Sequence, residues 1–179
     1  MKLSEMMASI TPSGSYKGIQ LPDKTVVAIN PDKKGTKPID EFVVFRELIE
    51  NISPTYSSET EEKNYYYDGK STVKTGVSVE LPISGQRYEG DAAQDLMVEN
   101  VFSIGEEAIF EVVWFNLNTG KGRVGTFTID PTQFEGGEAG DPGSPFELTL
   151  LKTGIQPVKF NYSTDKTKTF DEIVNPSEL

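Results

Sequence analysis

Two stretches of this 179-residue chain have residue types and spacings that could bind a phosphate or a metal ion. The segment Gly120–Gly125 (GKGRVG) fits the GxGxxG pattern, whose backbone amides bind phosphates when a helix follows. A strand-like sequence follows here, so we predict a hairpin turn instead. Glu135, Glu138 and Asp141 lie in a glycine-rich stretch and could offer oxygen ligands to Ca²⁺. Their spacing does not fit the EF-hand loop, which favours a solvated acidic loop.

A third cluster combines carboxylates with aromatic rings in the polar stretch before residue 70. A glycosidase uses such groups, but it needs two carboxylates held at a set separation on rigid elements. Aromatic residues beside charged ones are also common in protein interfaces. We interpret the cluster as an exposed charged loop with aromatic anchors. Its members are Glu59, Glu61, Glu62, Tyr65, Tyr66 and Tyr67.

Two absences from the composition limit the chemistry further. The chain has no cysteine and no histidine. It therefore lacks a thiol nucleophile, a disulfide, a histidine-containing triad and any metal site built from cysteine or histidine. Carboxylate, lysine and tyrosine chemistry remains, and no pattern of these residues indicates an active site. We expect a protein without catalysis, cofactor or bound metal.

The charge balance is strongly acidic. The net charge is −11 and the isoelectric point is about 4.5. Such a surface repels nucleic acid and anionic membranes, and it would suit a surface along which DNA slides without sticking. No apolar run approaches the ~20 residues of a membrane helix, and the start of the chain is too polar for a signal peptide. We expect a soluble protein, made in the cytoplasm, with no membrane partner.

The elements that must position these residues are mostly strands. Residues 1–41 are rich in Pro, Gly, Lys and Asp and are predicted to form an arm with one short strand at Thr25–Ile29. β-Branched and aromatic residues favour a strand over Phe42–Ile52. Ser53–Lys70 is predicted to be a long polar loop that ends with a turn signal, Asp68-Gly69. A loop of this length is unusual in a compact domain, and in an assembly it can reach a neighbour.

The stretch Thr72–Leu81 alternates between apolar and polar residues, which predicts a strand with two distinct faces. The apolar face could lie on a core, whereas the other face could meet only water or a polar partner. The apolar face is Val73, Thr75, Val77, Val79 and Leu81, and the polar face is Thr72, Lys74, Gly76, Ser78 and Glu80.

One helix is predicted after Gly90. Asp91 is a good N-cap, Gln94 is placed to complete a capping box, and Gly105 could end the element. Apolar residues follow at helical spacing and are expected to cover one face of a sheet. They are Ala93, Leu96, Met97 and Val101.

The second half of the chain is predicted to be strands and loops. Residues 108–116 and 123–130 form a hairpin across LNTGKG, and the first strand is apolar on both faces and therefore central. Phe110, Val112 and Trp114 share one of its faces. An acidic loop at 131–145 precedes a second hairpin across Thr153-Gly154, and residues 163–179 form a polar tail with a short apolar contact near Phe170.

In order and context these elements resemble the major tail proteins of siphophages, the tail tube protein family. The resemblance covers residues 42–160 and depends on the order of its segments, because no single motif is diagnostic. The segments are SSETEEKNYYYDG, TVKTGVSVEL, GQRYEGDAAQDLM and EVVWFNLNTGKGRVGTFTI.

The resemblance implies a mainly β fold: a two-sheet β-sandwich or partial barrel with one flanking α-helix and a long β-hairpin arm. Residues 42–162 would be the tail-tube domain, residues 1–41 an N-terminal arm and residues 163–179 a C-terminal tail. Members assemble as stacked hexameric rings around a lumen. The implied ring-stacking loop contains Glu59, Glu61, Glu62, Lys63, Tyr65, Tyr66 and Tyr67, and the implied lumen face contains Thr72, Lys74, Ser78 and Glu80.

The same resemblance implies that the protein works in the virion tail after synthesis in the cytoplasm of a host bacterium. Copies of the same chain, a tape measure protein and tail terminator and initiator proteins would be its partners, and DNA would pass without specific binding. Two alternatives stay open. One is an Ig-like or carbohydrate-binding β-sandwich for capsid decoration or adhesion, and the other is the tube subunit of a tail-derived bacteriocin.

Overall fold

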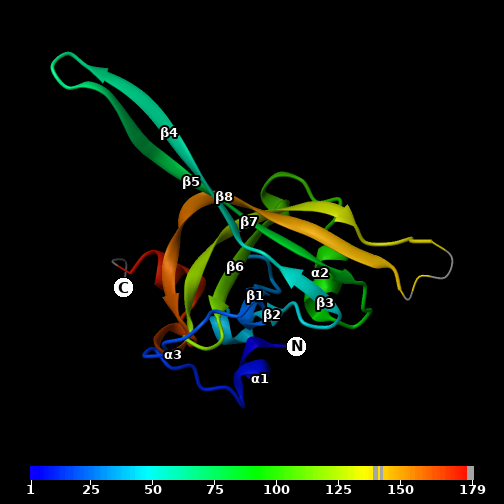
Figure 1. The fold of residues 1–179 in the computed structure, drawn as a ribbon. Helices are drawn as coiled ribbons and strands as arrows, with labels where there is room; N and C mark the ends of the chain where they lie inside the picture. Colours follow the sequence, from blue (N-terminus) through cyan, green and yellow to red (C-terminus); the bar gives the residue numbers. More distant parts are fainter. Residues whose placement is uncertain (139–140, 142, 177–179) are drawn as a thin grey trace.

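The structure is a computed structural model, and it describes residues 1–138, 141 and 143–176. Eight antiparallel strands form one curled sheet, from which a two-stranded ribbon projects (Figure 1). The expected mainly β fold is confirmed, in the form of a partial barrel built from one sheet. The strands are β1 (Thr25–Ile29), β2 (Val43–Val44), β3 (Ile49–Ile52), β4 (Thr55–Tyr65), β5 (Gly69–Gln86), β6 (Ile109–Asn116), β7 (Lys121–Gln133) and β8 (Pro145–Asn161).

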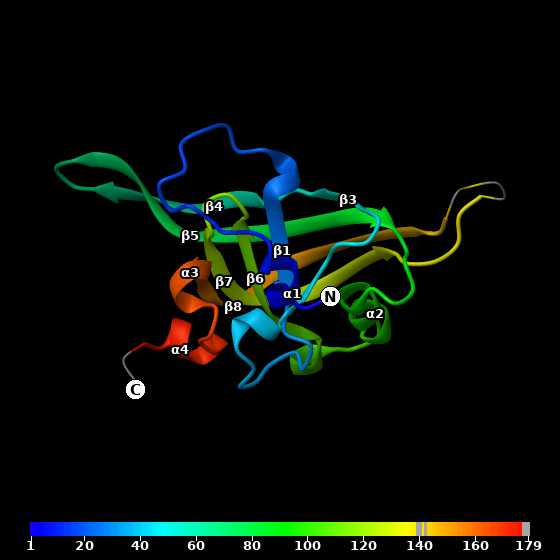
Figure 2. The same ribbon diagram turned by 90° about the horizontal axis from the view of Figure 1, so that it is seen from below.

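Short helices cover this sheet. The helix α2 lies toward the end of the body away from the ribbon, whereas α3 and α4 follow the end of β8 (Figure 2). The sequence predicted only α2. The helices are α1 (Leu3–Met7), α2 (Ala92–Glu99), α3 (Tyr162–Asp165) and α4 (Phe170–Val174), with 3₁₀ turns at Pro22–Lys24, Ile39–Glu41 and Gly105–Ala108.

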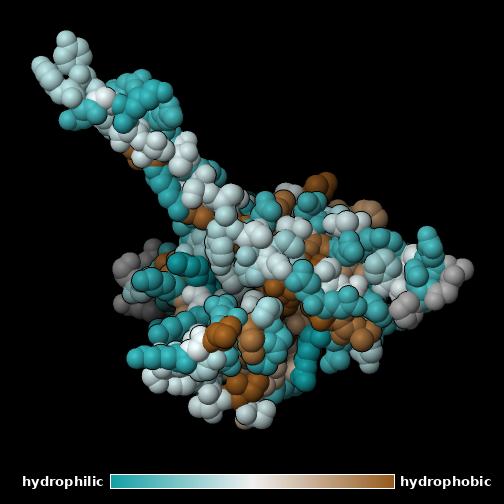
Figure 3. Space-filling view, in the orientation of Figure 1, coloured by the Kyte–Doolittle hydropathy of each residue, from teal (hydrophilic) through white to brown (hydrophobic). Residues whose placement is uncertain are grey.

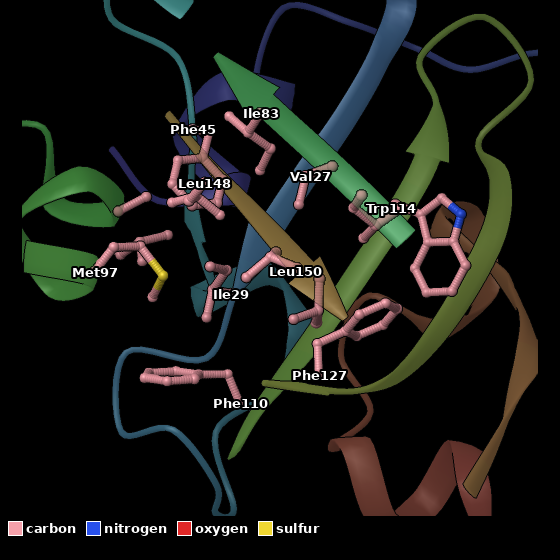
Figure 4. Close-up of a cluster of buried hydrophobic side chains, with 14 of the residues drawn as sticks. Val27, Ile29, Phe45, Ile83, Met97, Phe110, Trp114, Phe127, Leu148 and Leu150 are labelled. Carbon is pink, nitrogen blue, oxygen red and sulfur yellow. The ribbon is translucent and has the colours of Figure 1, made fainter. Parts of the chain in front are cut away.

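The sheet buries apolar side chains on both faces. Its strands run in the order β2-β1-β6-β7-β8-β5-β3, and β4 pairs with the outer part of β5. One core contains Phe110, Val112 and Trp114 of β6, together with Met97 of α2, and the last two lie at opposite ends of the cluster in Figure 4. The other core lies on the opposite face of β6 and includes Phe115. The central position of β6, buried on both sides, is confirmed.

The start of α2 follows local hydrogen-bond chemistry. The Asp91 side chain accepts hydrogen bonds from the backbone N–H groups of Ala93 and Gln94, as predicted for an N-cap. The predicted capping box is wrong. The buried Gln94 amide accepts from the N–H of Tyr88 and donates to the carbonyl of Glu47, so it joins two loops instead.

The end of α2 also differs from the prediction. The helix ends at Glu99, with Asn100 as its C-cap, and Gly105 instead begins a separate 3₁₀ turn. The predicted apolar stripe does face a core. Ala93 and Met97 are buried in it, and Leu96 and Val101 pack against it.

The single strand predicted over Phe42–Ile52 is wrong. The chain forms β2, leaves the sheet after Phe45, and joins the opposite edge of the sheet as β3. The backbone N–H groups of Arg46 and Glu47 both donate to the Asp91 carboxylate, and Leu48 has a positive φ of 54°. These local bonds replace the ladder bonds that a continuous strand would have made.

The predicted hairpin across Thr153-Gly154 is also wrong, because β8 continues through it and pairs with β7 along its length. Val124 pairs with Val158 but Thr126 pairs with Thr153, so β8 accommodates extra residues as a bulge. Gly154 supplies the positive φ of 64° within this bulge, and the Thr126 hydroxyl donates to the Thr153 carbonyl over 2.6 Å. A bulged strand bends, which helps the sheet to curl.

The terminal segments complete the second core. The strand predicted at Thr25–Ile29 is confirmed, and it pairs with β6 along its whole length. Leu3 and Met7 of α1 are buried against the same face as Phe170 and Ile173 of α4. The expected apolar contact near Phe170 is therefore present, within a capped helix.

Candidate assembly surfaces

The most exposed element is the ribbon formed by β4 and residues 69–77 of β5, which we call the arm. The sequence predicted a loop at Ser53–Lys70, but Thr55–Tyr65 is a regular strand paired with β5. Thr, Ser and Tyr residues favour extended backbone, and Gly69, with φ of 74°, allows the tight turn. All eleven β4 residues are exposed, and the arm surface is mostly hydrophilic (Figure 3).

A bulge divides the arm into two parts. Thr75 is an extra residue in β5 between two regularly paired stretches, and one extra residue moves the following side chains to the other face. Thr72 and Lys74 therefore do not share a face with Ser78 and Glu80. The single polar face predicted for these four residues is wrong, because alternation along one strand does not reveal a bulge.

The tip of the arm presents an aromatic pair. Tyr66 and Tyr67 are 94% and 92% exposed, and Tyr65 beside them is about half exposed. The two outer rings lie edge to face, with centroids 5.0 Å apart and planes at 81°. This arrangement offers no flat platform for a sugar ring. Exposed tyrosines of this kind are typical anchors of protein interfaces.

Little within the subunit stabilises the arm. Its ion pairs, Lys63–Glu61 at 3.6 Å and Lys70–Glu62 at 3.2 Å, are solvent-exposed and contribute between about 0 and 1 kcal/mol each. An isolated two-stranded hairpin is marginally stable in water, and both of its edges offer unpaired backbone groups. The arm has the properties of an element that becomes fully ordered on a partner.

A second candidate surface is the outer face of the sheet formed by β5, β8 and β7, which we call the open face. The strand register places Glu80 beside Leu151, and Asp130 beside Thr149. Glu80, Asp130 and Glu147 are exposed on it. Sequence reasoning missed the last two, because their neighbours come from other strands. Its remaining members are Ser78, Pro82, Ser84, Thr128, Thr149 and Leu151, none of which is charged.

The two stretches considered above for phosphate and metal binding lie in a hairpin and in a loop. Residues 120–125 turn into β7 at Lys121, so the predicted hairpin is confirmed. Asp141 accepts a hydrogen bond from the N–H of Glu138, within the loop predicted to be solvated. Among the described residues, no group of three or more acidic side chains could hold a metal ion.

Within residues 1–138, 141 and 143–176, no helix is long and apolar enough to cross a membrane.

One buried carboxylate was not predicted. Glu111 of β6 is almost fully buried and accepts a hydrogen bond from the Asn30 side-chain amide over 2.7 Å. Burial raises the pKa of Glu111, and the bonds from Asn30 and from the Gly35 N–H oppose this only in part. The Lys33 carbonyl also accepts the Glu111 backbone N–H. These contacts attach the loop after β1 to the sheet.

Comparison with known proteins gives a likeness of fold. No protein-family model and no curated protein sequence matches this chain. A chain from the tail of an empty gene transfer agent particle, solved with helical refinement and C6 symmetry, is 14% identical with a TM-score of 0.56. A chain from the virion of a native gene transfer agent particle is 12% identical, also with a TM-score of 0.56. Each likeness covers 76% of this chain and 96% of the other. The fold likeness to a tail protein, which the sequence indicated, is therefore confirmed.

Proposed function

We propose that this protein is the structural subunit of a tail tube in a phage-like particle. Six copies form a ring, and the rings stack into a hollow tube that delivers DNA. The fold likeness to a chain in a tail with C6 symmetry supports this assembly. The protein is made in the cytoplasm of a host bacterium, works in the virion tail, and catalyses no reaction.

The observation that carries this proposal is the arm. All eleven residues of β4 are exposed, the two tyrosines that follow the strand are more than 90% exposed, and only Tyr56 at its base bonds to a core side chain. Exposed edges of this length invite association with another chain. In a tube each arm contacts another subunit, and this contact stacks one ring on the next.

The open face is the candidate lining of the lumen. It has three carboxylates, Glu80, Asp130 and Glu147, which repel the phosphates of DNA, so DNA slides through without specific binding. Ser78 and Glu80 keep the lumen role that the resemblance implied. Thr72 and Lys74, which lie beyond the bulge, belong to the arm. Tape measure, terminator and initiator proteins are the further partners.

Negative-stain electron microscopy of the concentrated protein, with light scattering on the same sample, tests the proposal. Hollow tubes or six-fold rings of uniform width are expected. A protein that stays monomeric at every concentration, and also on addition of preformed tail initiator complexes, would exclude a tube subunit. It would instead favour a free-standing β-sandwich module, to be followed by a glycan-binding screen.

A shortened variant separates the arm from the body. Replacing residues 60–75 with an Asn-Gly turn would join β4 and β5 near Glu59 and Gly76, which pair with each other. We expect an unchanged free energy of unfolding, because the removed residues are exposed, and complete loss of tubes. Normal tubes from this variant would show that the arm does not stack rings.

A further inference from the structure

A hollow of about 520 Å³ lies at the base of the arm. Its walls come from the segment before β1, from the first residues of β4, and from the hairpin between β6 and β7. These parts are far apart in the sequence, so no local pattern indicated the hollow. The residues that give it its chemistry are Tyr16, Tyr56, Trp114, Asn116, Lys121 and Arg123.

Aromatic rings line part of this hollow. The Trp114 indole N–H donates to the Tyr56 hydroxyl over 3.2 Å. This bond joins the core to the base of strand β4. Tyr56 and Tyr16 are both exposed. Aromatic walls of this kind bind other aromatic side chains through edge-to-face and offset contacts.

The hollow is also basic, which is unusual in a chain with a net charge of −11. Lys121 donates to the Gly14 carbonyl at 3.2 Å, and Arg123 to the Pro157 carbonyl at 3.3 Å. In the described part of the chain neither forms an ion pair with a carboxylate. The buried side-chain nitrogen of Asn116 has no hydrogen-bond partner. Because this nitrogen is buried, the hollow offers two accessible cationic donors, Lys121 and Arg123, to an acidic or hydroxyl-bearing partner.

The outer arm has the complementary chemistry. It combines the exposed tyrosines Tyr66 and Tyr67 with solvent-exposed carboxylates. Two of these carboxylates form weak, exposed ion pairs with Lys63 and Lys70, so a partner's cations would exchange with those lysines. Tyrosine rings fit aromatic walls and stack with guanidinium groups, and their hydroxyls accept hydrogen bonds. The carboxylates of the outer arm are Glu59, Glu61, Glu62 and Asp68.

A subunit cannot place this tip in its own hollow. Tyr56 lines the hollow and the tip follows Tyr65, at the far end of an eleven-residue strand. At about 3.3 Å per residue, β4 holds the tip up to about 36 Å away. The occupant must therefore come from another molecule.

We propose that the hollow at the arm base binds the Tyr66–Tyr67 tip of a second copy of this chain. This inference rests on the proposed function and identifies the acceptor for the arm. The tip rings pack against Tyr16 and Tyr56, and Lys121 and Arg123 pair with the arm carboxylates. Because each hollow lies at the base of its own arm, two linked hollows are no further apart than one arm length, about 36 Å.

Disulfide cross-linking tests this contact without background, since the chain has no cysteine. One variant carries Asp68→Cys, which leaves both tip tyrosines in place, and a second carries Gln20→Cys at the exposed rim of the hollow. A third carries Glu89→Cys beside α2, away from the hollow, as the matched control. Each pair is mixed, oxidised and mapped by peptide mass spectrometry, and the same samples are imaged by electron microscopy.

Cross-linking of Asp68→Cys to Gln20→Cys is expected to exceed cross-linking to Glu89→Cys several-fold. Equal yields at the two sites would overturn the proposed contact. If tubes formed while the tip cross-linked elsewhere, the acceptor would be wrong and the tube function would stand. If neither tubes nor a tip–hollow cross-link formed in initiator-supplemented samples, both proposals would fail.

Charge reversal gives an independent readout. The double variant Lys121→Glu, Arg123→Glu is expected to lose cross-linking and tubes. Its unfolding is measured beside that of the parent, because both side chains also donate to backbone carbonyls. Adding Glu61→Lys and Glu62→Lys to the same chain should restore both. Failure of this restoration, with the fold intact, would contradict charge pairing between arm and hollow.

Discussion

Glu111 shows how one buried carboxylate links folding to pH. Its pKa is raised above the ordinary value of 4.5, chiefly by burial, so the folded protein holds this proton more tightly than the unfolded chain. Stability from this group is therefore greatest below pH 4.5 and falls as the pH rises through the raised pKa. In Glu111→Gln the side chain is neutral at every pH, so we expect the variant to gain stability relative to the parent as the pH rises.

Urea unfolding of both proteins between pH 4 and pH 8 measures this difference. The substitution Ser57→Ala in the exposed strand β4 neither adds nor removes a titratable group, so it provides the control. For Ser57→Ala the difference in unfolding free energy from the parent should stay flat with pH. A flat difference for Glu111→Gln as well would mean that burial of Glu111 has no effect on its proton.

The Asp91 carboxylate accepts hydrogen bonds from four backbone N–H groups, so the stability of the fold should be sensitive to its removal. It caps α2 and also accepts hydrogen bonds from Arg46 and Glu47, which hold the crossing between β2 and β3. Asp91→Ala leaves these N–H groups without their acceptor and should lower the free energy of unfolding by about 2 kcal/mol. Glu99→Ala, at the exposed end of the same helix, should change it by less than about 0.5 kcal/mol. Equal effects in chemical denaturation would contradict the dual role of Asp91.

For single residues, prediction from the sequence succeeded where the hydrogen-bond partners are close together in the chain. The N-cap of Asp91 depends on the next three residues, and these are visible in the sequence. The partners of Gln94 and Glu111 include Glu47 and Asn30, which are distant in the chain. Their bonds could not be predicted without the fold.

At the scale of elements, successive side chains of β8 alternate between the buried core and the open face. Leu150 is fully buried between Leu81 of β5 and Ile129 of β7, whereas Leu151 lies half-buried on the open face beside Glu80. Leu150→Ala should cost about 2 to 5 kcal/mol through lost burial and a residual cavity. Leu151→Ala should cost less than about 1 kcal/mol. Thermal and urea unfolding measure both, and similar losses would contradict the register of β8.

Strands such as β1 and β6 were predictable from alternation and β-branched residues, whereas the polar β4 was predicted to be a loop and the bulges were not predicted. Thr75 and Gly154 both interrupt regular pairing, and each interruption depends on the partner strand. At Gly154 the sequence indicated a hairpin, since Thr-Gly is common in turns. At Thr75 it indicated one continuous polar face. Both errors have the same physical cause, which is that register is a property of two strands.

At the scale of the whole molecule, the curled sheet extends in two opposite directions. The arm projects from one end, and the paired outer ends of β7 and β8 extend toward the other (Figure 1). The order of the strands and the curl could not be predicted, because they depend on contacts between distant segments. The mainly β class, the central β6 and the flanking α2 could be predicted, since each has a strong local pattern.

Assembly of such subunits must overcome long-range repulsion. Every copy has a net charge of −11, whereas the attraction proposed between tip and hollow acts only at contact. Salt shortens the screening length from about 30 Å at 10 mM to about 3 Å at 1 M, and it weakens repulsion between separated copies most. Contact pairs that exclude water are screened less.

Self-association should therefore increase with salt, as measured by light scattering at fixed protein concentration. The variant Glu99→Lys, Glu106→Lys is the control, because both side chains are exposed and lie away from the arm and the open face. Each change adds two positive charges, so its net charge is −7 instead of −11. It should associate at lower salt than the parent and respond less to added salt. Association that decreases with salt in both proteins would mean that contact attraction, and not net repulsion, controls assembly.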